Sequence, residues 1–315
     1  MAAVCHAEDV KIGFVHSGEI INDNSFNEMA VAGLRKLQKE QHVRILTRSA
    51  GFSTEATLNA VDSLLSEGVR IVVINGASIG NRFGEIALDH PEVVFILVDS
   101  RIEGYPNIIS IDYAQGKGSC LVGALCAWQS KTGRIGFIGG SELPVIKDFL
   151  NGFIKGVEYS GRKVDVMVDF VRKGESEKGF EDPQQASILA MRMYEAGADI
   201  IYAVAGLSGN GIIQAACKTG NLVVGVDSDQ DYMAKGTVLT SMMKRIDVTL
   251  HKEVLAVLNG TYVPGRKVYG LADHGVELTK MKYSRHLVSP VVLEKLDELK
   301  AKLISGKINL NFSAE

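Results

Sequence analysis

Apolar and polar residues along this chain follow two alternating rhythms, which predict strands and helices in regular succession. Short apolar runs, typical of strands buried on both faces, are each followed by a segment with apolar residues three and four positions apart, typical of a helix. Strands joined by helices in this way pair in parallel, so the pattern predicts a mainly parallel sheet covered by helices. The predicted strands of the first half are Val10–His16, Val43–Ser49, Ile71–Ile74, Val93–Asp99 and Ile108–Asp112, and its predicted helices are Glu28–Glu40, Ser53–Glu67 and Asn81–Asp89.

The same series begins again after residue 112 and predicts a second α/β half of similar size. Two successive halves of this kind predict two lobes with a cleft between them. The pattern does not show which lobe the final helix, Pro290–Ile304, covers. The other predicted strands are Arg134–Ile138, Asp165–Val171, Ile200–Val204, Leu222–Val226, Leu239–Met243 and Val268–Leu271, and the other predicted helices are Gly116–Ser130, Pro144–Tyr159, Pro183–Ala196, Asn210–Thr219 and Asp247–Leu258.

The loop Ile20–Asn27 connects the first predicted strand to the first helix. Asn24 or Ser25 is suited to the N-cap position of that helix. Phe26 has two interpretations, a core residue that staples the first helical turn or a cleft residue that stacks on a flat ligand. The residues alone favour the core position.

Polar residues and glycines collect directly after the predicted strands in both halves. The carboxyl ends of parallel strands share one edge of a sheet, and open α/β sheets place their ligands at that edge. Any one of these loops is more often an ordinary turn, but their collective placement predicts a ligand site. The loops are Asn22-Asp23, Asn75–Ser78, Asp99-Ser100, Gly139–Ser141, Ala205–Gly211 and Asp227–Gln230.

Composition places the chain among packed globular proteins and excludes several functions. The 315 residues suffice for two domains, and 46% of them are hydrophobic while 23% are charged. A net charge of -3 without a basic block argues against binding to nucleic acid. No apolar run reaches the length of a membrane span. Cys120 and Cys126 lie in a small, apolar helical segment, where we expect them to be packing residues.

Cys5 lies before the first predicted strand in a polar stretch, and two interpretations of it stay open. It is either the lipid-carrying first residue of a mature bacterial lipoprotein or an incidental thiol in a tail. Val4 directly before it differs from the small residue that usually precedes a lipidated cysteine.

The glycine loops carry no catalytic motif. Gly206–Gly211 lacks the spacing of the dinucleotide fingerprint, no Walker lysine follows a glycine loop, and no serine has the Gly-x-Ser-x-Gly context of a nucleophile elbow. Asp227 and Asp229 could serve acid–base chemistry or a metal, but hydrogen bonding to a sugar or helix capping is the more common use of such a pair. The sequence therefore predicts a binding protein and not an enzyme such as a nucleoside hydrolase.

Several short motifs, each weak alone, occur in an order that resembles the PnrA-like basic membrane protein family. Its members are bacterial lipoproteins that serve as substrate-binding components of ABC importers, and the resemblance covers residues 10–303. It implies an α/β fold of the two-lobe periplasmic binding protein type I, each lobe a mainly parallel sheet flanked by helices. The motifs are Ile21–Asn27, Gly139-Gly140, Pro144–Ile146, Gly152-Phe153 with Gly156-Val157, Gly206 with Gly209–Gly211, Gly225–Gln230 and Lys244–Asp247.

The resemblance also implies a ligand site, because some family members hold a purine base between two phenylalanines and the ribose with polar residues. Phe26 matches the first aromatic plate, against the core interpretation, and Phe180 matches the second. Polar positions that contact the sugar or base are matched by Asp99, Gly206, Asp227 and Lys244, and the predicted set also includes Ser17, Asn22 and Asn210.

Ser17 marks a departure from the nucleoside-binding members, which carry an aspartate there to accept from the purine edge. A serine hydroxyl both donates and accepts, so the charged acceptor is missing. Leu207 also replaces the second glycine of a usual Gly-Gly pair. Both changes favour a larger or differently edged heterocycle, and the family includes riboflavin-binding lipoproteins. We therefore expect riboflavin as the transported ligand, with a purine nucleoside as the alternative, and no cofactor.

The resemblance further implies partners, location and domain limits. We expect a monomer outside the cytoplasm, in the periplasm where there is one, anchored as a lipoprotein through Cys5 and working with an ABC transporter permease. The predicted parts are a tail and anchor region at residues 1–9, an N-terminal lobe of residues 10–111 and 244–268, and a C-terminal lobe of residues 112–243 and 269–315.

Overall fold

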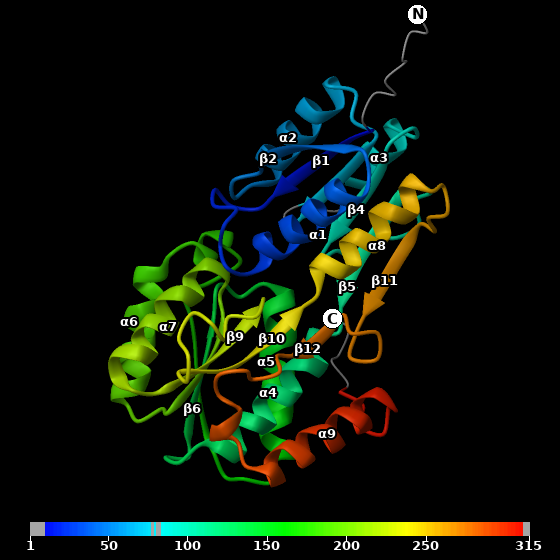
Figure 1. The fold of residues 1–315 in the computed structure, drawn as a ribbon. Helices are drawn as coiled ribbons and strands as arrows, with labels where there is room; N and C mark the ends of the chain where they lie inside the picture. The colour runs from blue at the N-terminus through cyan, green and yellow to red at the C-terminus, as the bar shows by residue number, and fades with distance from the viewer. Residues whose placement is uncertain (1–9, 77–78, 80–82, 311–315) are drawn as a thin grey trace, which may run out of the picture. The chain divides into compact units, whose positions relative to one another are not determined.

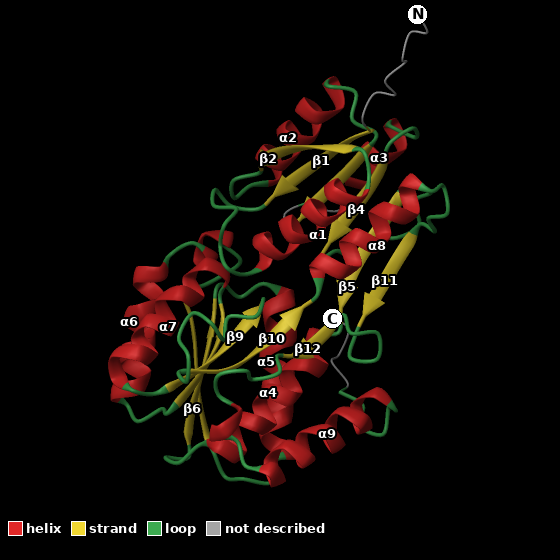
Figure 2. Cartoon of the chain, in the orientation of Figure 1, coloured by secondary structure: helices red, strands yellow, loops and turns green. Residues whose placement is uncertain are grey.

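The computed structural model describes residues 10–76, 79 and 83–310, which form two compact units. Each unit is built on one six-stranded sheet with helices on both faces (Figure 1; Figure 2). The chain passes from one unit to the other several times, so neither unit is a continuous stretch. Of the described residues, the first unit comprises those within 10–19, 30–112 and 246–267, and the second comprises 20–29, 113–245 and 268–310.

The sheet of the first unit has the strand order β11-β5-β4-β3-β1-β2, and β1 to β5 pair in parallel. The residues of β3 and β5 are all buried, because both strands lie inside the sheet, and β3 is apolar on both faces except at its last residue, Asn75. On the edge, β2 alternates between exposed and less exposed residues. The strands are β1 (Val10–His16), β2 (Val43–Ser49), β3 (Ile71–Asn75), β4 (Val94–Val98), β5 (Ile108–Tyr113) and β11 (Gly265–Tyr269).

Two pairs of helices cover the two faces of this sheet (Figure 1). One pair, α2 and α3, buries Leu64 and Phe83 against strand residues such as Phe95. In the other pair, α1 and α8 approach so closely that a Cβ on Gly33 would lie 2.5 Å from the carbonyl oxygen of Asp247. The helices are α1 (Phe26–Glu40), α2 (Thr54–Ser66), α3 (Phe83–Asp89) and α8 (Ile246–Leu258).

The second unit has the strand order β12-β10-β9-β8-β6-β7, parallel except for the antiparallel pair β10 and β12. Helices α6 and α7 bury small and branched residues against one face, and α4 and α5 lie on the other (Figure 1). The strands are β6 (Arg134–Gly139), β7 (Asp165–Phe170), β8 (Ile200–Val204), β9 (Leu222–Asp227), β10 (Val238–Lys244) and β12 (Val276–Leu278), and the helices are α4 (Gln115–Gln129), α5 (Pro144–Tyr159), α6 (Pro183–Glu195), α7 (Gly209–Thr219) and α9 (Pro290–Ile304).

Glycines bring α4 and α5 into backbone contact. A Cβ on Gly156 would overlap the carbonyl oxygen of Cys120, and a Cβ on Gly152 would overlap the carbonyl oxygen of Gly116. From the other side, a Cβ on Gly123 would overlap the carbonyl oxygen of Phe153. The glycines of the Gly152 and Gly156 motifs are therefore helix-packing residues.

The final helix, α9, packs on α4 in the second unit, which answers a question that the sequence pattern left open. The Lys295 ammonium lies 5.5 Å from the centroid of the Trp128 ring, and the Lys302 ammonium donates to the Tyr159 hydroxyl at 3.0 Å. At its N-terminus, Ser289 caps the helix by accepting from the Val292 N–H. These contacts fix the C-terminal region to the outside of the α4–α5 face.

The predicted fold class is confirmed, and most predicted elements differ from the observed ones by no more than two residues at each end. The strand predicted at Val268–Leu271 is wrong by several residues, because β11 is Gly265–Tyr269. The pattern missed β12, which has too few residues for a periodicity to show. Residues 20–29 group with the second unit because their hydrogen bonds run to β9 and the turn after it.

Candidate ligand-binding site

The second sheet has a topological switch point between β6 and β8, since the chain runs outward from this pair in both directions. Loops after such neighbouring strands separate and leave room for a ligand at the carboxyl edge. Phe180 lies at this point. A Cβ on Gly140, after β6, would overlap the Phe180 ring, and a Cβ on Gly206, after β8, would lie 3.4 Å from the Phe180 Cβ. The two glycines thus let an aromatic ring lie against the backbone of both loops.

Ser208 holds the turn that carries Phe180. This fully buried hydroxyl accepts from the Asp182 N–H at 2.7 Å and donates to the Gly179 carbonyl at 2.8 Å. The two bonds flank Phe180 in the chain and fix its short 3-10 helix, Glu177–Phe180. Phe180 itself is only half-buried, so one part of its ring surface is not covered by the protein.

Asp227 occupies a strained turn at the end of β9. Its φ is +65°, and the Ser228 N–H donates to the Val226 carbonyl at 2.8 Å, which closes a three-residue γ-turn around it. Such turns with positive φ are rare and persist where the surroundings hold them, often at functional sites. The Asp227 carboxylate is buried, and its Oδ2 accepts from the Ser25 hydroxyl at 2.5 Å.

The N-terminus of α1 is capped differently from the prediction. Neither Asn24 nor Ser25 provides the cap side chain, because Ser25 donates to Asp227. Instead the buried Asp23 carboxylate accepts from the N–H groups of Ser25, Asn27 and Glu28 at 2.9, 2.9 and 3.1 Å. Burial raises the pKa of Asp23, although these backbone donors oppose the increase. The cap leaves Ser25 available to orient Asp227.

Lys244 is a fully buried cation surrounded by aromatic rings. Its Nζ lies 5.3 Å from the Phe26 centroid, 4.9 Å from that of Tyr113 and 5.5 Å from that of Phe149. Ring faces attract a cation, and the attraction is larger when water is excluded. Phe26 is half-buried and its ring lies beside this cation, which favours a place at the site over the core position that the residues alone favoured.

The remaining predicted residues are distributed over both units. In the second unit, Asn22 is exposed, and Asn210 has an amide oxygen that is buried without a hydrogen-bond partner among the described residues. In the first unit, Ser17 donates its N–H to the Asn75 carbonyl at 3.1 Å, and Asp99 has a positive φ of 57° at the end of β4. Sequence reasoning missed Tyr113, Phe149 and Ser208, for which no local pattern gave a signal.

The described residues contain no group of His, Cys, Asp and Glu that could hold a metal ion. Asp227 is buried while Asp229 is exposed, so the two carboxylates do not form one site. Burial raises the pKa of Cys120 to about 12, which agrees with its predicted role in packing. Cys5 lies outside the described residues. Among the helices that the structure describes, none has the length and apolarity needed to span a bilayer.

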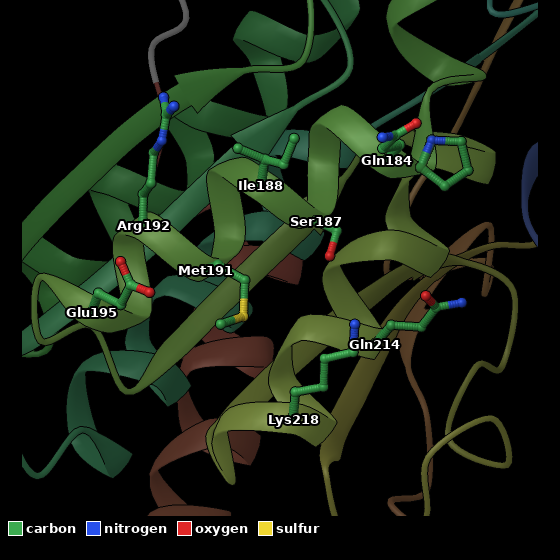
Figure 3. A pocket seen from close by; sticks show the side chains of 9 residues that line it. Gln184, Ser187, Ile188, Met191, Arg192, Glu195, Gln214 and Lys218 are labelled. Carbon is green, nitrogen blue, oxygen red and sulfur yellow. The ribbon is translucent and has the colours of Figure 1, made fainter.

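An open groove with a volume of about 590 Å³ lies on the outer side of α6 and α7 (Figure 3). It is lined by Ile188 and Met191 together with charged and polar side chains such as Arg192, Glu195 and Lys218. None of the predicted site residues in the described part of the chain lines this groove. We therefore place the candidate site at the carboxyl edge of the sheet and not in this groove.

Asp231 lies near the site in a buried polar network. Its carboxylate accepts from the Thr279 hydroxyl at 2.7 Å and from the Ser241 hydroxyl at 3.1 Å, and these residues tie β10 to the segment that follows β12. Burial raises the pKa of Asp231, the Thr279 hydrogen bond lowers it, and the charge of Asp229 raises it. The net direction is upward from the usual 3.8.

Replacing Asp231 with asparagine should change how stability depends on pH. Because the folded-state pKa is above the unfolded one, the folded wild type binds more protons between the two values, and its unfolding free energy decreases as pH rises through them. The stability of the wild type relative to Asp231→Asn should thus be highest at and below the unfolded-state pKa of about 4 and should decrease as the pH rises above it. Urea unfolding of both proteins below and above this pKa measures the difference, and a relative stability that increases with pH would contradict the raised pKa.

Comparison with known proteins gives the family. Residues 9–311 match the Bmp family, described as ABC transporter substrate-binding protein PnrA-like. The chain belongs to this family. The members of this family are the substrate-binding components of ABC transporters, and they are not enzymes. The chain is therefore such a component, and it acts outside the cytoplasm with a small-molecule ligand and a permease.

Several known proteins are similar to this chain over nearly its whole length. Basic membrane protein A2 of Borrelia garinii subsp. bavariensis is 29% identical over 97% of this chain and 89% of its own. The ABC transporter nucleoside-binding protein BmpA of Lactococcus lactis subsp. cremoris is 28% identical over 96% of this chain and 89% of its own. The crystal structure of an ABC transporter solute-binding protein from Aeropyrum pernix superposes with a TM-score of 0.86 at 23% identity, covering 95% and 92% of the two chains, and shares the fold.

Proposed function

We propose that this protein binds a purine nucleoside and delivers it to its ABC transporter permease. The observation that carries the proposal is the arrangement of Phe26, Asp227 and Lys244 at one edge of the second sheet, with Phe180 at the switch point of the same sheet. A relative of similar length is named a nucleoside-binding protein, which supports the same ligand class.

The chemistry of these residues fits a base joined to a ribose. Phe180 and Phe26 each offer a half-buried ring to a flat heterocycle, and stacking of a base on an aromatic side chain contributes about 1–3 kcal/mol. The Asp227 carboxylate accepts from sugar hydroxyls, and the Lys244 ammonium donates to sugar or base oxygens. The backbone at Gly206 and the buried amide oxygen of Asn210 add a donor or acceptor near Phe180. Asn22 is the remaining member of the proposed ligand-binding set in the second unit.

Ser17 and Asp99 of the first unit stay in the proposed set on the sequence resemblance. The inference of riboflavin depended mainly on Ser17 in place of a carboxylate. In the structure Ser17 packs directly on a loop glycine, since a Cβ on Gly76 would lie 2.8 Å from the Ser17 Cβ. This contact explains the glycine at position 76, and Ser17 alone is the sequence signal that favoured riboflavin at this position. The comparisons favour the nucleoside alternative over riboflavin.

Anchoring through a lipid on Cys5 is also a proposal. The family resemblance and the position of Cys5 before β1 support it. Mass spectrometry of the protein isolated from membranes would show the diacylglyceryl group on Cys5, and a Cys5→Ser variant should be released into the soluble fraction.

The wild-type protein should bind at least one of adenosine, guanosine and inosine more tightly than it binds riboflavin. A nucleoside consists of one flat base and one ribose. The proposed residues provide two aromatic rings for the base and a set of polar groups for the ribose. Isothermal titration of the purified protein with each of the four ligands measures the dissociation constants. Uridine is the matched control, because it keeps the ribose but has a smaller ring to stack.

Riboflavin binding that is tighter than that of all three purine nucleosides would contradict the nucleoside proposal and support the flavin alternative. The absorbance spectrum of the purified protein provides an independent check, since a retained flavin absorbs visible light and a purine does not. Chromatography of each nucleoside after incubation with the protein should recover it unchanged, as expected for a binding protein.

A further inference from the structure

Gln230 is a buried side chain whose two amide atoms hold two different segments. It is 1% exposed and lies three residues after Asp227. Its Oε1 accepts from the Val226 N–H at 3.1 Å, and its Nε2 donates to the Asn24 carbonyl at 2.9 Å. The Gln230 N–H also donates to the Ser241 hydroxyl at 3.1 Å, which fixes the residue to β10. One side chain thus links the end of β9 to the segment Ile20–Met29, which contains the start of α1.

We propose that Gln230 is a positioning residue of the ligand site, which holds Asp227 and the segment Ile20–Met29 in their binding geometry without contacting the ligand. The proposal rests on the proposed function, because it assigns Asp227 and Phe26 to nucleoside binding.

The turn at Asp227 needs such support because its backbone is strained. A non-glycine residue with a φ of +65° inside a γ-turn is held in place only when several neighbouring contacts require it. Gln230 fixes the residue before Asp227 through the Val226 N–H, and Ser25 fixes the Asp227 carboxylate itself. Asn24 connects these two contacts, because its carbonyl accepts from Gln230 and it directly precedes Ser25 in the chain.

Asn24 is the second strained residue of this arrangement. Its φ is +55°, and its carbonyl accepts from the Ser228 hydroxyl at 2.6 Å as well as from Gln230 at 2.9 Å. Two donors on one carbonyl satisfy both of its lone pairs. The segment that carries Ser25 and Phe26 is therefore attached to the Asp227 turn at this carbonyl.

Gly225 makes room for the Gln230 side chain in this position. A Cβ on Gly225 would overlap the Gln230 Oε1 and lie 2.8 Å from the Ser241 Oγ. This gives a physical reason for the glycine in the Gly225–Gln230 motif. A neutral amide is also required, since one end must accept from an N–H and the other must donate to a carbonyl.

Replacing Gln230 with glutamate tests the donor directly. The size is retained, and a carboxylate oxygen can still accept from the Val226 N–H, but an ionised carboxylate cannot donate to the Asn24 carbonyl. Burial should raise the pKa of the new carboxyl group, so the protonated form, which can donate, is populated at low pH. We expect nucleoside binding by Gln230→Glu to be about 10-fold to 100-fold weaker than that of the wild type near pH 8. Near about pH 5, affinity should recover most of this loss.

The measurement is isothermal titration with adenosine, guanosine and inosine between about pH 5 and about pH 8, with each affinity expressed relative to the wild type at the same pH. This ratio cancels the pH effects that both proteins share, including those of the neighbouring carboxyl groups. These belong to Asp23, Asp227, Asp229 and Asp231. Gln214→Glu, at an exposed position on α7, is the matched control and should bind like the wild type at every pH. Gln230→Met, which can neither donate nor accept in this way, should bind weakly at every pH.

Wild-type affinity of Gln230→Glu near pH 8 would overturn the positioning role. A loss of affinity that stays the same near pH 5 would also overturn it, because it would indicate general damage to the fold. Hydrogen exchange of the ligand-free protein provides a readout that does not need a nucleoside. Peptides covering Ile20–Met29 and Val226–Asp231 should exchange faster in Gln230→Met than in the wild type, and unchanged exchange would overturn the proposal. If the wild type binds none of the three nucleosides, the proposed function fails, and the exchange experiment still decides the role of Gln230.

Discussion

Replacing Phe180 with alanine should weaken purine nucleoside binding by about 10-fold to 100-fold while leaving the protein folded. Base stacking on an aromatic side chain contributes about 1–3 kcal/mol, which corresponds to this change in the dissociation constant. Phe180 is half-buried and lies over the backbone of Gly140 and Gly206, so its ring contributes little to the hydrophobic core. We expect a similar loss for Phe26→Ala, because its ring is also half-buried and is positioned beside Lys244.

Thermal unfolding of the ligand-free variants separates binding from folding. Phe83→Ala is the matched control, since Phe83 is fully buried in the first unit and packs edge-to-face on Phe95. Truncating a core phenylalanine typically costs about 3–5 kcal/mol, so this control should lose much of its stability. A comparable loss in Phe180→Ala or Phe26→Ala would assign that ring to the core and remove it from the proposed site.

Replacing Gly156 with alanine should destabilise the second unit, although the same change stabilises most helices. In an exposed helical position, alanine is favoured over glycine by about 1 kcal/mol. Here the added Cβ would overlap the Cys120 carbonyl oxygen and lie 2.8 Å from the Ala124 nitrogen, both of them backbone atoms that cannot turn away. Separating α4 from α5 should cost about 2 kcal/mol or more, as for other overpacked interiors.

Urea unfolding followed by far-UV circular dichroism measures the effect on stability. Asn151→Ala is the control, because Asn151 lies on the exposed side of the same helix and its replacement should leave stability unchanged or slightly higher. A more stable Gly156→Ala would show that α4 and α5 can separate freely and that the glycine is not needed for their contact.

The sequence by itself determined the order of strands and helices and the family. Central strands such as Ile71–Asn75 could be predicted because burial on both faces requires apolar residues throughout, a property visible in a single segment. The helix Pro144–Tyr159 could be predicted because its proline and its apolar spacing mark its start and its buried face. The described residues of the predicted loops also lie at the carboxyl edges of the two sheets, since parallel pairing requires it.

Only the tertiary structure decided which side chains in those loops act on one another. Asp23, and not Asn24 or Ser25, caps α1, because Ser25 is engaged by Asp227, a residue 202 positions away. Gln230 holds Asn24 over a separation of 206 positions, and no local pattern records such a bond.

The surroundings of Lys244 were also decided by the fold. Its ammonium is enclosed by Phe26, Tyr113 and Phe149, which come from three separate parts of the chain. Periodicity reports the face of an element that is buried, since this depends on neighbours in sequence. The partner of a buried polar group depends on which distant segments the sheet brings together, so it is determined by topology and packing and is seen only in the folded chain.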